Sequence, residues 1–174
     1  SAILRGFQTW TEQTGSNVGV VPESAAKLPF GVPGPRTGDP RFGDIRIGAR
    51  PLSSNVKAIA VAHNTIVSGT WSGDVIFNSA ATFENLEELY RVALHEAGHV
   101  FGLENSEHPR SPMNDESRSL IPTEQDIEGV QQLHGERTVD QNEGELGNNT
   151  WRTATPLELE LSPQDGSLKA LTHL

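Results

Sequence analysis

Cysteine is absent from this chain of 174 residues, which excludes both a disulfide framework and a metal site built on thiolates. Long apolar runs are also absent: none approaches the ~18 residues of a membrane-spanning helix, so we expect no membrane partner. Basic residues are scarce, with 13 Lys and Arg against 23 Asp and Glu. The resulting net charge of −10 argues against nucleic acid as a partner, because nucleic-acid binding depends on basic patches. The abundance of Gly and Pro predicts a globular domain with long loops.

The most informative pattern is formed by His95, Glu96 and His99, which match H-E-x-x-H. Two histidines four residues apart lie on the same face of a helix, so both imidazoles can reach one Zn²⁺ at about 2.0–2.1 Å. Bound zinc lowers the pKa of its water to about 7, and a neighbouring carboxylate can then accept the proton. Glu96 is the candidate for this role. The pattern therefore predicts hydrolysis of a peptide bond.

The surrounding segment is predicted to form a buried helix over residues 85–101. Asn85, with Glu88 three residues later, is typical of a helix start, and Gly102 is typical of a residue just beyond a helix end. Apolar residues recur at helical spacing: Leu86, Leu89, Tyr90, Ala93, Leu94, Ala97, Val100 and Phe101. A charged helix face with two histidines by chance is the competing interpretation. Imidazoles on a buried helix need a partner, which favours the metal.

Other elements complete an α+β pattern. We expect a first helix over residues 1–14, and strands near 43–49, 56–63 and 74–78. A last helix begins at Thr123 and ends at Gly135, with Ile127, Val130 and Leu133 facing inward. The strand at 74–78 is expected at an edge of the sheet, where a substrate backbone could pair with it. The alternative is an edge strand that is simply exposed.

The sequence HEAGHVFGLEN from His95 to Asn105 resembles the signature H-E-x-x-H-x-x-G-x-x-H of the metzincin zinc peptidases. In that family the glycine turns the chain out of the helix, and a methionine lies in a tight turn beneath the zinc. Gly102 and Met113, the only methionine, match these two positions. Taken alone, Met113 could equally fill a gap in the core.

Further segments narrow the resemblance to the matrixins, the matrix-metalloproteinase-like catalytic domains, over residues 1–135. These segments are Ala2–Trp10, Phe42–Ile47, Ala60–His63, Gly73–Phe77 and Pro122–Gly135. The resemblance implies a twisted mixed β-sheet packed on an active-site helix and a first helix. It also implies a C-terminal helix after the Met-turn. The strand that precedes the first helix in the family has no counterpart here, so we expect a truncated or processed fragment.

The third zinc ligand is where this chain departs from the family pattern. Position 105 is Asn rather than His, and an amide oxygen is a poorer zinc ligand than imidazole or carboxylate. Asn105 could coordinate weakly, His108 could replace it, or waters could complete the site. The spacing from 105 to Met113 favours Asn105, whereas ligand chemistry favours His108. A solvated loop histidine is the alternative for His108.

The resemblance also implies a second, structural zinc and bound calcium. His63 stands at one structural position, but Ile76 and Asn78 replace other ligands, so we expect His63 to be an ordinary strand histidine. Calcium near Asp74 is an option without a full ligand set. Asn114 and Asp115 stand where the family usually has Tyr-Pro in the wall of the specificity pocket, so substrate preference cannot be transferred.

Residues 136–174 have a different character. Asp140 to Asn149 is acidic and rich in Asn and Gly, which is typical of a linker. Asn148 to Leu157 resembles the opening of the bacterial pre-peptidase C-terminal domains. Leu157, Leu159 and Leu161 alternate with acidic residues, which predicts one strand. We therefore expect a linker and the start of a C-terminal extension, and a secreted, bacterial protein.

Three functions compete. The leading hypothesis is a zinc endopeptidase that acts on a peptide or protein substrate, with Glu96 as general base and His95, His99 and Asn105 (or His108) as metal ligands. The alternative is a catalytically inactive, protease-like binding module, because position 105 is Asn. A third is a structural extracellular domain that pairs with partners through an edge strand.

Overall fold

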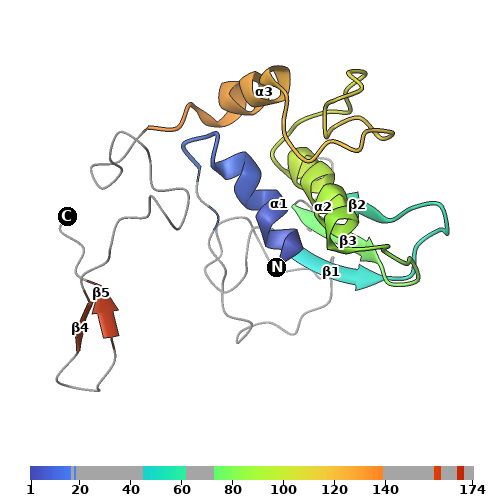
Figure 1. Ribbon diagram of the computed structural model, residues 1–174, viewed down its shortest axis with the longest axis horizontal. Coiled ribbons are helices and arrows are strands. Elements are labelled where there is room, and N and C mark those ends of the chain that lie inside the picture. The colour runs from blue at the N-terminus through green and yellow to red at the C-terminus, as the bar shows by residue number, and fades with distance from the viewer. Residues whose placement is uncertain (17, 19–44, 62–72, 139–158, 162–167, 171–174) are drawn as a thin grey trace. The chain divides into compact units, whose positions relative to one another are not determined.

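The computed structural model describes residues 1–16, 18, 45–61, 73–138, 159–161 and 168–170 (Figure 1). The chain divides into two compact units, Ser1–Arg137 and Thr138–Leu174, which are treated separately. The second unit contains β4 (Leu159–Leu161) paired antiparallel with β5 (Leu168–Ala170). The expected strand is therefore present at 159–161, while its first residue, Leu157, lies outside the described residues. None of the described helices is long and apolar enough to cross a membrane.

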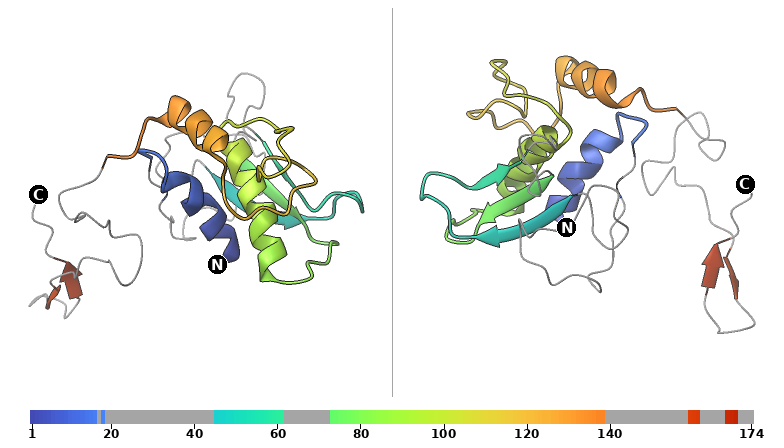
Figure 2. Two further views of the ribbon diagram at one scale, coloured as in Figure 1. Left: turned by 45° about the horizontal axis from the view of Figure 1, so that its top comes forward. Right: turned by 180° about the vertical axis from the view of Figure 1, so that it is seen from behind.

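The described residues of the first unit form three helices and a three-stranded mixed sheet, which confirms the α+β class. The elements are α1 (Ala2–Thr11), β1 (Arg46–Arg50), β2 (Ala58–Ala60), β3 (Asp74–Asn78), α2 (Leu86–Val100) and α3 (Glu124–His134). The sheet order is β1-β3-β2, with β1 parallel and β2 antiparallel to β3. Figure 2 shows α1 and α2 side by side, with the sheet against α2. The first helix ends three residues earlier than predicted, because the chain turns through Gln13 and Thr14.

The prediction that residues 74–78 form the edge strand is wrong. β3 lies between β1 and β2, and all five of its residues are buried. A run of apolar residues predicts that a strand is buried, but it does not show which strands pair with it. Within the described residues, β2 has a neighbour on one side only, so the open edge next to α2 belongs to β2.

The core of the unit lies between α1, α2 and the sheet. Phe7 and Trp10 of α1 are buried against α2, and the Trp10 indole N–H donates to the carbonyl of Leu94 at 2.8 Å. The two helices approach closely at Gly6, where an added Cβ would lie 2.8 Å from backbone atoms of Ala93 and Leu94. Glycine at this point lets the helix backbones pack directly against each other.

The helix ends follow the predicted signals. Asn85 caps α2 by accepting from the Glu88 amide at 2.9 Å, and Gly102 has the positive φ of +94° that glycine adopts readily. Thr123 and Asp126 form a capping box at the start of α3. Two residues of the expected apolar faces differ: Leu86 is 74% exposed and Leu133 is 58% exposed, and each lies at an end of its helix.

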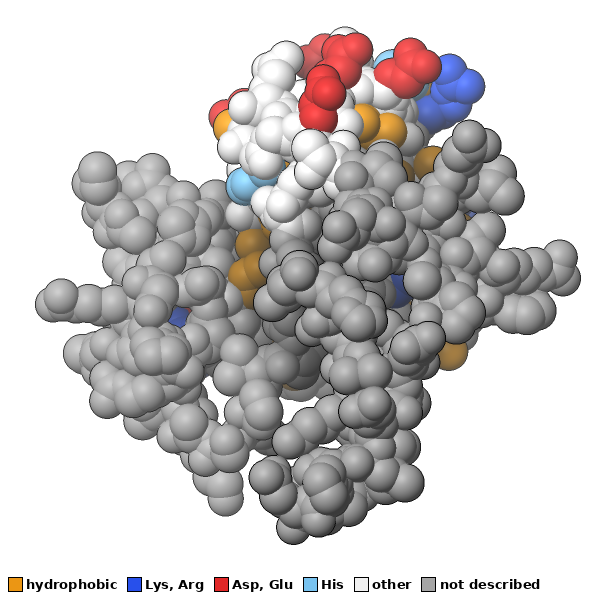
Figure 3. Space-filling model, turned by 90° about the vertical axis from the view of Figure 1, so that its left-hand side faces the viewer, with side chains coloured by type: hydrophobic (Ala, Val, Ile, Leu, Met, Phe, Trp, Pro, Cys, Tyr) orange, Lys and Arg blue, Asp and Glu red, His pale blue; other side chains and the backbone are white. Residues whose placement is uncertain are grey.

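Most of the face in Figure 3 is not described, and its described part shows acidic side chains together with basic ones. The exposed positions of α3 include two glutamates, Glu124 and Glu128.

Candidate metal centre

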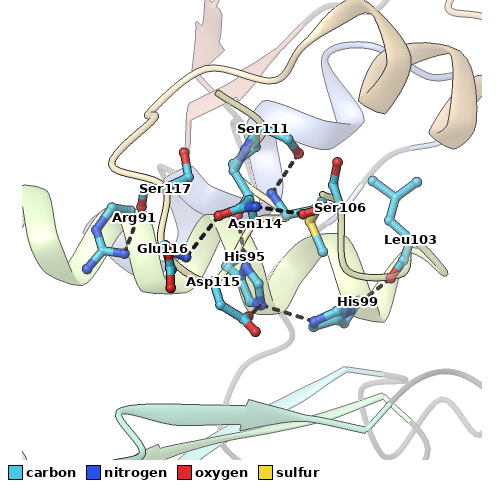
Figure 4. A network of polar contacts seen from close by, with 12 residues as sticks. Arg91, His95, His99, Leu103, Ser106, Ser111, Asn114, Asp115, Glu116 and Ser117 are labelled. Atoms are coloured by element: carbon cyan, nitrogen blue, oxygen red, sulfur yellow. Dashed lines mark hydrogen bonds and ion pairs between the residues drawn. The ribbon is translucent and has the colours of Figure 1, made fainter. Parts of the chain in front are cut away.

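His95 and His99 lie one helical turn apart on α2, and their Nε2 atoms face each other at 3.1 Å (Figure 4). The opposite nitrogen of each ring is held by backbone. His95 Nδ1 contacts the carbonyl of Pro112 at 2.8 Å, and His99 Nδ1 contacts the carbonyl of Leu103 at 2.8 Å. A carbonyl only accepts, so both Nδ1 atoms carry hydrogen. In each neutral ring, Nε2 is therefore the nitrogen with the free lone pair.

This arrangement of the two rings fits a zinc ion. Two lone pairs 3.1 Å apart repel each other unless a cation or a proton lies between them. Two ligand atoms that share one zinc at about 2.05 Å, at a tetrahedral angle, lie about 3.3 Å apart. Histidines that bind metals usually donate their other N–H to a carbonyl or carboxylate, as both do here. The donors, their tautomers and their spacing therefore suit Zn²⁺.

Burial shifts the pKa values of two neighbouring side chains on α2, His95 and Glu96. Desolvation lowers the pKa of His95, and the Pro112 carbonyl partly opposes this effect. Burial raises the pKa of Glu96 to about 7, and the negative charge of Asp115 adds to the rise, while a hydrogen bond from the Ala60 backbone opposes it. Glu96 is only 8% exposed. A carboxyl with this pKa can both hold and release a proton near neutral pH.

The Ala60 bond also locates the site with respect to the sheet. Ala60 ends β2, and its neighbour Val61 donates its N–H to the carbonyl of Asp74. Successive residues of a strand direct their backbone groups to opposite sides, so the Ala60 N–H points away from β3 and towards Glu96. The edge of β2 that has no partner strand among the described residues therefore runs beside the carboxyl group of Glu96.

Met113 packs against α2 and is 1% exposed. Its side chain occupies the space next to Gly98, where an added Cβ would overlap Met113 Sδ and lie 2.9 Å from Met113 Cε and 3.2 Å from Trp10 Cζ2. Ser111 holds the turn: its hydroxyl accepts from the Met113 amide at 2.9 Å and donates to Asp126 at 2.7 Å. The turn that carries the Pro112 carbonyl is thus anchored between α2 and α3.

The family model described as "Matrixin" matches residues 39–135, more than half of the chain. The chain belongs to the matrixin family. Matrixins are zinc metallopeptidases, so the family accounts for both the metal-binding pattern and the α+β fold. No curated protein sequence matches this matrixin.

The two sequence candidates for a third ligand stay outside this cluster. Asn105 is exposed, and His108 accepts a hydrogen bond from the Arg110 amide at 3.2 Å through its Nδ1. Within the described residues, neither side chain hydrogen bonds to or stacks on the imidazoles of α2. No three His, Asp or Glu side chains in the described part of this matrixin form a ready-made metal site. The third ligand stays a prediction.

Asp115 is the residue that sequence reasoning missed. Its Oδ1 lies 3.5 Å from His95 Nε2, and its side chain is 71% exposed (Figure 4). In the sequence alone, Asp115 is only a departure from the family's Tyr-Pro. The available signal was an acidic residue two positions after Met113, on a turn that had to pass close to the metal-binding helix.

The residues at the expected accessory metal sites have other partners. The buried Asp74 carboxylate accepts from Arg46 Nε at 2.6 Å and from Nη2 at 2.7 Å, so both oxygens bind a guanidinium group. Asn78 bonds through its side-chain amide to backbone atoms of the loop before β2, including the Val56 carbonyl at 2.7 Å. Ile76 is buried in β3. His63 lies outside the described residues, and calcium at Asp74 stays a prediction.

Proposed function

We propose that this matrixin is a zinc-dependent endopeptidase in which His95 and His99 bind the metal and Glu96 is the general base. The observation that carries the proposal is the pair of Nε2 lone pairs 3.1 Å apart, with both Nδ1 atoms held by carbonyl groups. The two imidazoles therefore have the spacing and the tautomers that a shared cation requires. Zinc, when bound, polarises the scissile carbonyl and makes a water more acidic.

Glu96 moves the proton in this proposal. Its carboxylate accepts a proton from the attacking water and passes it to the leaving amine. Burial raises its pKa to about 7, which stabilises the protonated form, while the Ala60 N–H stabilises the ionised form. The two influences suit a group that must change its protonation state twice in each turnover.

The substrate is a peptide or protein whose backbone lies along the open edge of β2. This edge replaces the expected one at β3. The support is the Ala60 N–H, which links β2 directly to Glu96, so a chain paired with β2 would pass beside the general base. Secretion belongs to the same proposal, because the family resemblance implies it.

The test is cleavage of a denatured protein by the full chain. We expect cleavage to stop with chelator and to return with zinc. Glu96→Gln should lower kcat about 10²–10⁴-fold while zinc binding stays near one per chain. Glu87→Gln is the matched control, because Glu87 lies exposed on the same helix. Cleavage that persists in chelator, or a Glu96→Gln variant as active as wild type, would overturn the proposal.

An inactive binding module is the second candidate, and Asn105 favours it. This residue is exposed, and the described residues contain no complete three-ligand group. Zinc content after dialysis separates the two functions. About one zinc per chain supports the peptidase, whereas almost none, together with absent cleavage, supports the binding module.

A further inference from the structure

We infer that Asp115, from the turn after Met113, supplies the third metal ligand in place of residue 105. The inference rests on the proposed function, since it concerns the same metal. It assigns this matrixin a ligand set of two imidazoles and one carboxylate, drawn from α2 and the following turn rather than from the extended H-E-x-x-H signature.

Three electron-pair donors converge at this point. His95 Nε2 lies 3.1 Å from His99 Nε2 and 3.5 Å from Asp115 Oδ1 (Figure 4). With both Nδ1 atoms protonated, neither Nε2 of the neutral rings has a hydrogen to donate, and an ionised carboxylate has none. At these two distances from His95 Nε2, the atoms repel each other unless a cation or a proton lies between them. Both distances are close to the ~3.3 Å that separates two atoms bound to the same zinc.

Hydrogen bonds hold the backbone on both sides of Asp115, whereas its side chain is largely exposed. On one side, the Pro112 carbonyl holds His95, and Asn114 Nδ2 donates to the Ser106 carbonyl at 2.8 Å. On the other side, the Ser117 amide donates to the Asn114 carbonyl at 3.0 Å. The Asp115 side chain is 71% exposed. We expect this side chain to turn towards the metal and to complete a group that the described residues do not form by themselves.

Ligand chemistry favours Asp115 over the two sequence candidates. Zinc binds carboxylate oxygen at about 2.0–2.2 Å, and catalytic sites with two histidines and one carboxylate keep a fourth position open for water or substrate. Asn105 offers only an amide. His108 uses its Nδ1 to accept from the Arg110 amide. Asp115 alone among the three already lies beside an imidazole of α2.

The experiment is zinc titration of the full chain against a competing chelator dye, at low and at high salt. Asp115→Asn should weaken zinc binding more than ~100-fold, because changes outside the ligand shell cost about 10–100-fold. Glu116→Gln is the matched control: it removes the same charge from the next, exposed residue and should leave affinity unchanged. Asn105→Ala and His108→Ala should also bind zinc as wild type does.

The loss in Asp115→Asn should persist at about 1 M salt, where charges more than ~3 Å apart are screened. The visible absorption of the Co²⁺-loaded variant should also differ from that of wild type. A loss that disappears at high salt would mean that Asp115 acts only through its charge, which overturns the inference. Wild-type affinity in Asp115→Asn overturns it as well, and so does a loss confined to Asn105→Ala or His108→Ala.

Failure of the inference and failure of the proposed function give different results. If Asp115→Asn binds zinc normally while His95→Ala does not, the ligand assignment is wrong and the peptidase proposal stands. If wild type itself binds no zinc, both are wrong. Circular dichroism of each variant verifies that the fold is kept.

Discussion

The packing of Met113 against Gly98 leads to a double-mutant prediction. Gly98 lies on α2 between the two histidines, and Met113 fills the space beside it. In Gly98→Ala the new methyl group would overlap Met113 Sδ, and it would lie 2.9 Å from Met113 Cε and 3.2 Å from Trp10 Cζ2. The end of a methionine usually moves easily, but Met113 is 1% exposed and Trp10 is fully buried, so neither has free space to enter.

The expected magnitudes follow from this crowding. Overpacking a buried site lowers the free energy of unfolding by about 1–3 kcal/mol, whereas replacing glycine by alanine in a helix raises it by about 1 kcal/mol. Gly98→Ala should therefore lower the free energy of unfolding by up to about 2 kcal/mol. Met113→Ala should lower it by about 2–5 kcal/mol through a cavity. In the double variant the alanine methyl group occupies part of that cavity, so the combined loss should be at least about 1 kcal/mol smaller than the sum.

The assay is urea unfolding followed by circular dichroism in the presence of chelator, so that metal binding does not contribute. Gly129→Ala is the control, because its new methyl group would meet only Leu103 Cδ2, at 3.0 Å, the end of a half-buried side chain. This variant should be as stable as wild type or up to about 1 kcal/mol more stable. Additivity of Gly98→Ala and Met113→Ala within about 0.3 kcal/mol would refute the packing argument.

Two further predictions concern the same site. Zinc affinity should fall as the pH falls, because only the neutral imidazole binds metal; burial lowers the pKa of His95 from 6.5, so the fall should come below pH 6.5. Zinc titrations from about pH 8 to pH 5 measure this, and a loss already complete near pH 7 would contradict it. Asp126→Asn should lower the free energy of unfolding by about 1–3 kcal/mol, since one oxygen accepts from Ser111 and the other from Thr123, and an amide NH₂ must then face one of these donors. Urea unfolding tests this, and a change below about 0.5 kcal/mol would show that the anchor of the turn is dispensable.

The features that the sequence predicted correctly depend on short spacings along the chain. Two histidines four residues apart share a helix face whatever surrounds them. The same holds for the Asn85 cap, the capping box of Thr123 and Asp126, and the positive φ of Gly102, each of which involves atoms within one turn. Helix and strand positions were therefore predictable, as was the approach of His95 to His99 on one helix face.

The features that the sequence could not decide depend on contacts between distant residues. An apolar run at 74–78 does not reveal that β1 and β2 both pair with β3, so the edge was assigned to the wrong strand. From the sequence, Asn78 stands where the family has a metal ligand. In the structure its side-chain amide donates to the Val56 carbonyl in the loop before β2.

By itself, the sequence determined that a buried helix presents two imidazoles and a carboxylate, because helical spacing is a local property. Only the tertiary structure decided which groups face them. The turn around Met113 passes beside α2, and this brings the Pro112 carbonyl to His95 Nδ1 and the Asp115 carboxylate to within 3.5 Å of His95 Nε2. Contacts of this kind depend on how helices and turns pack together, and the spacing of residues along the chain does not reveal that packing.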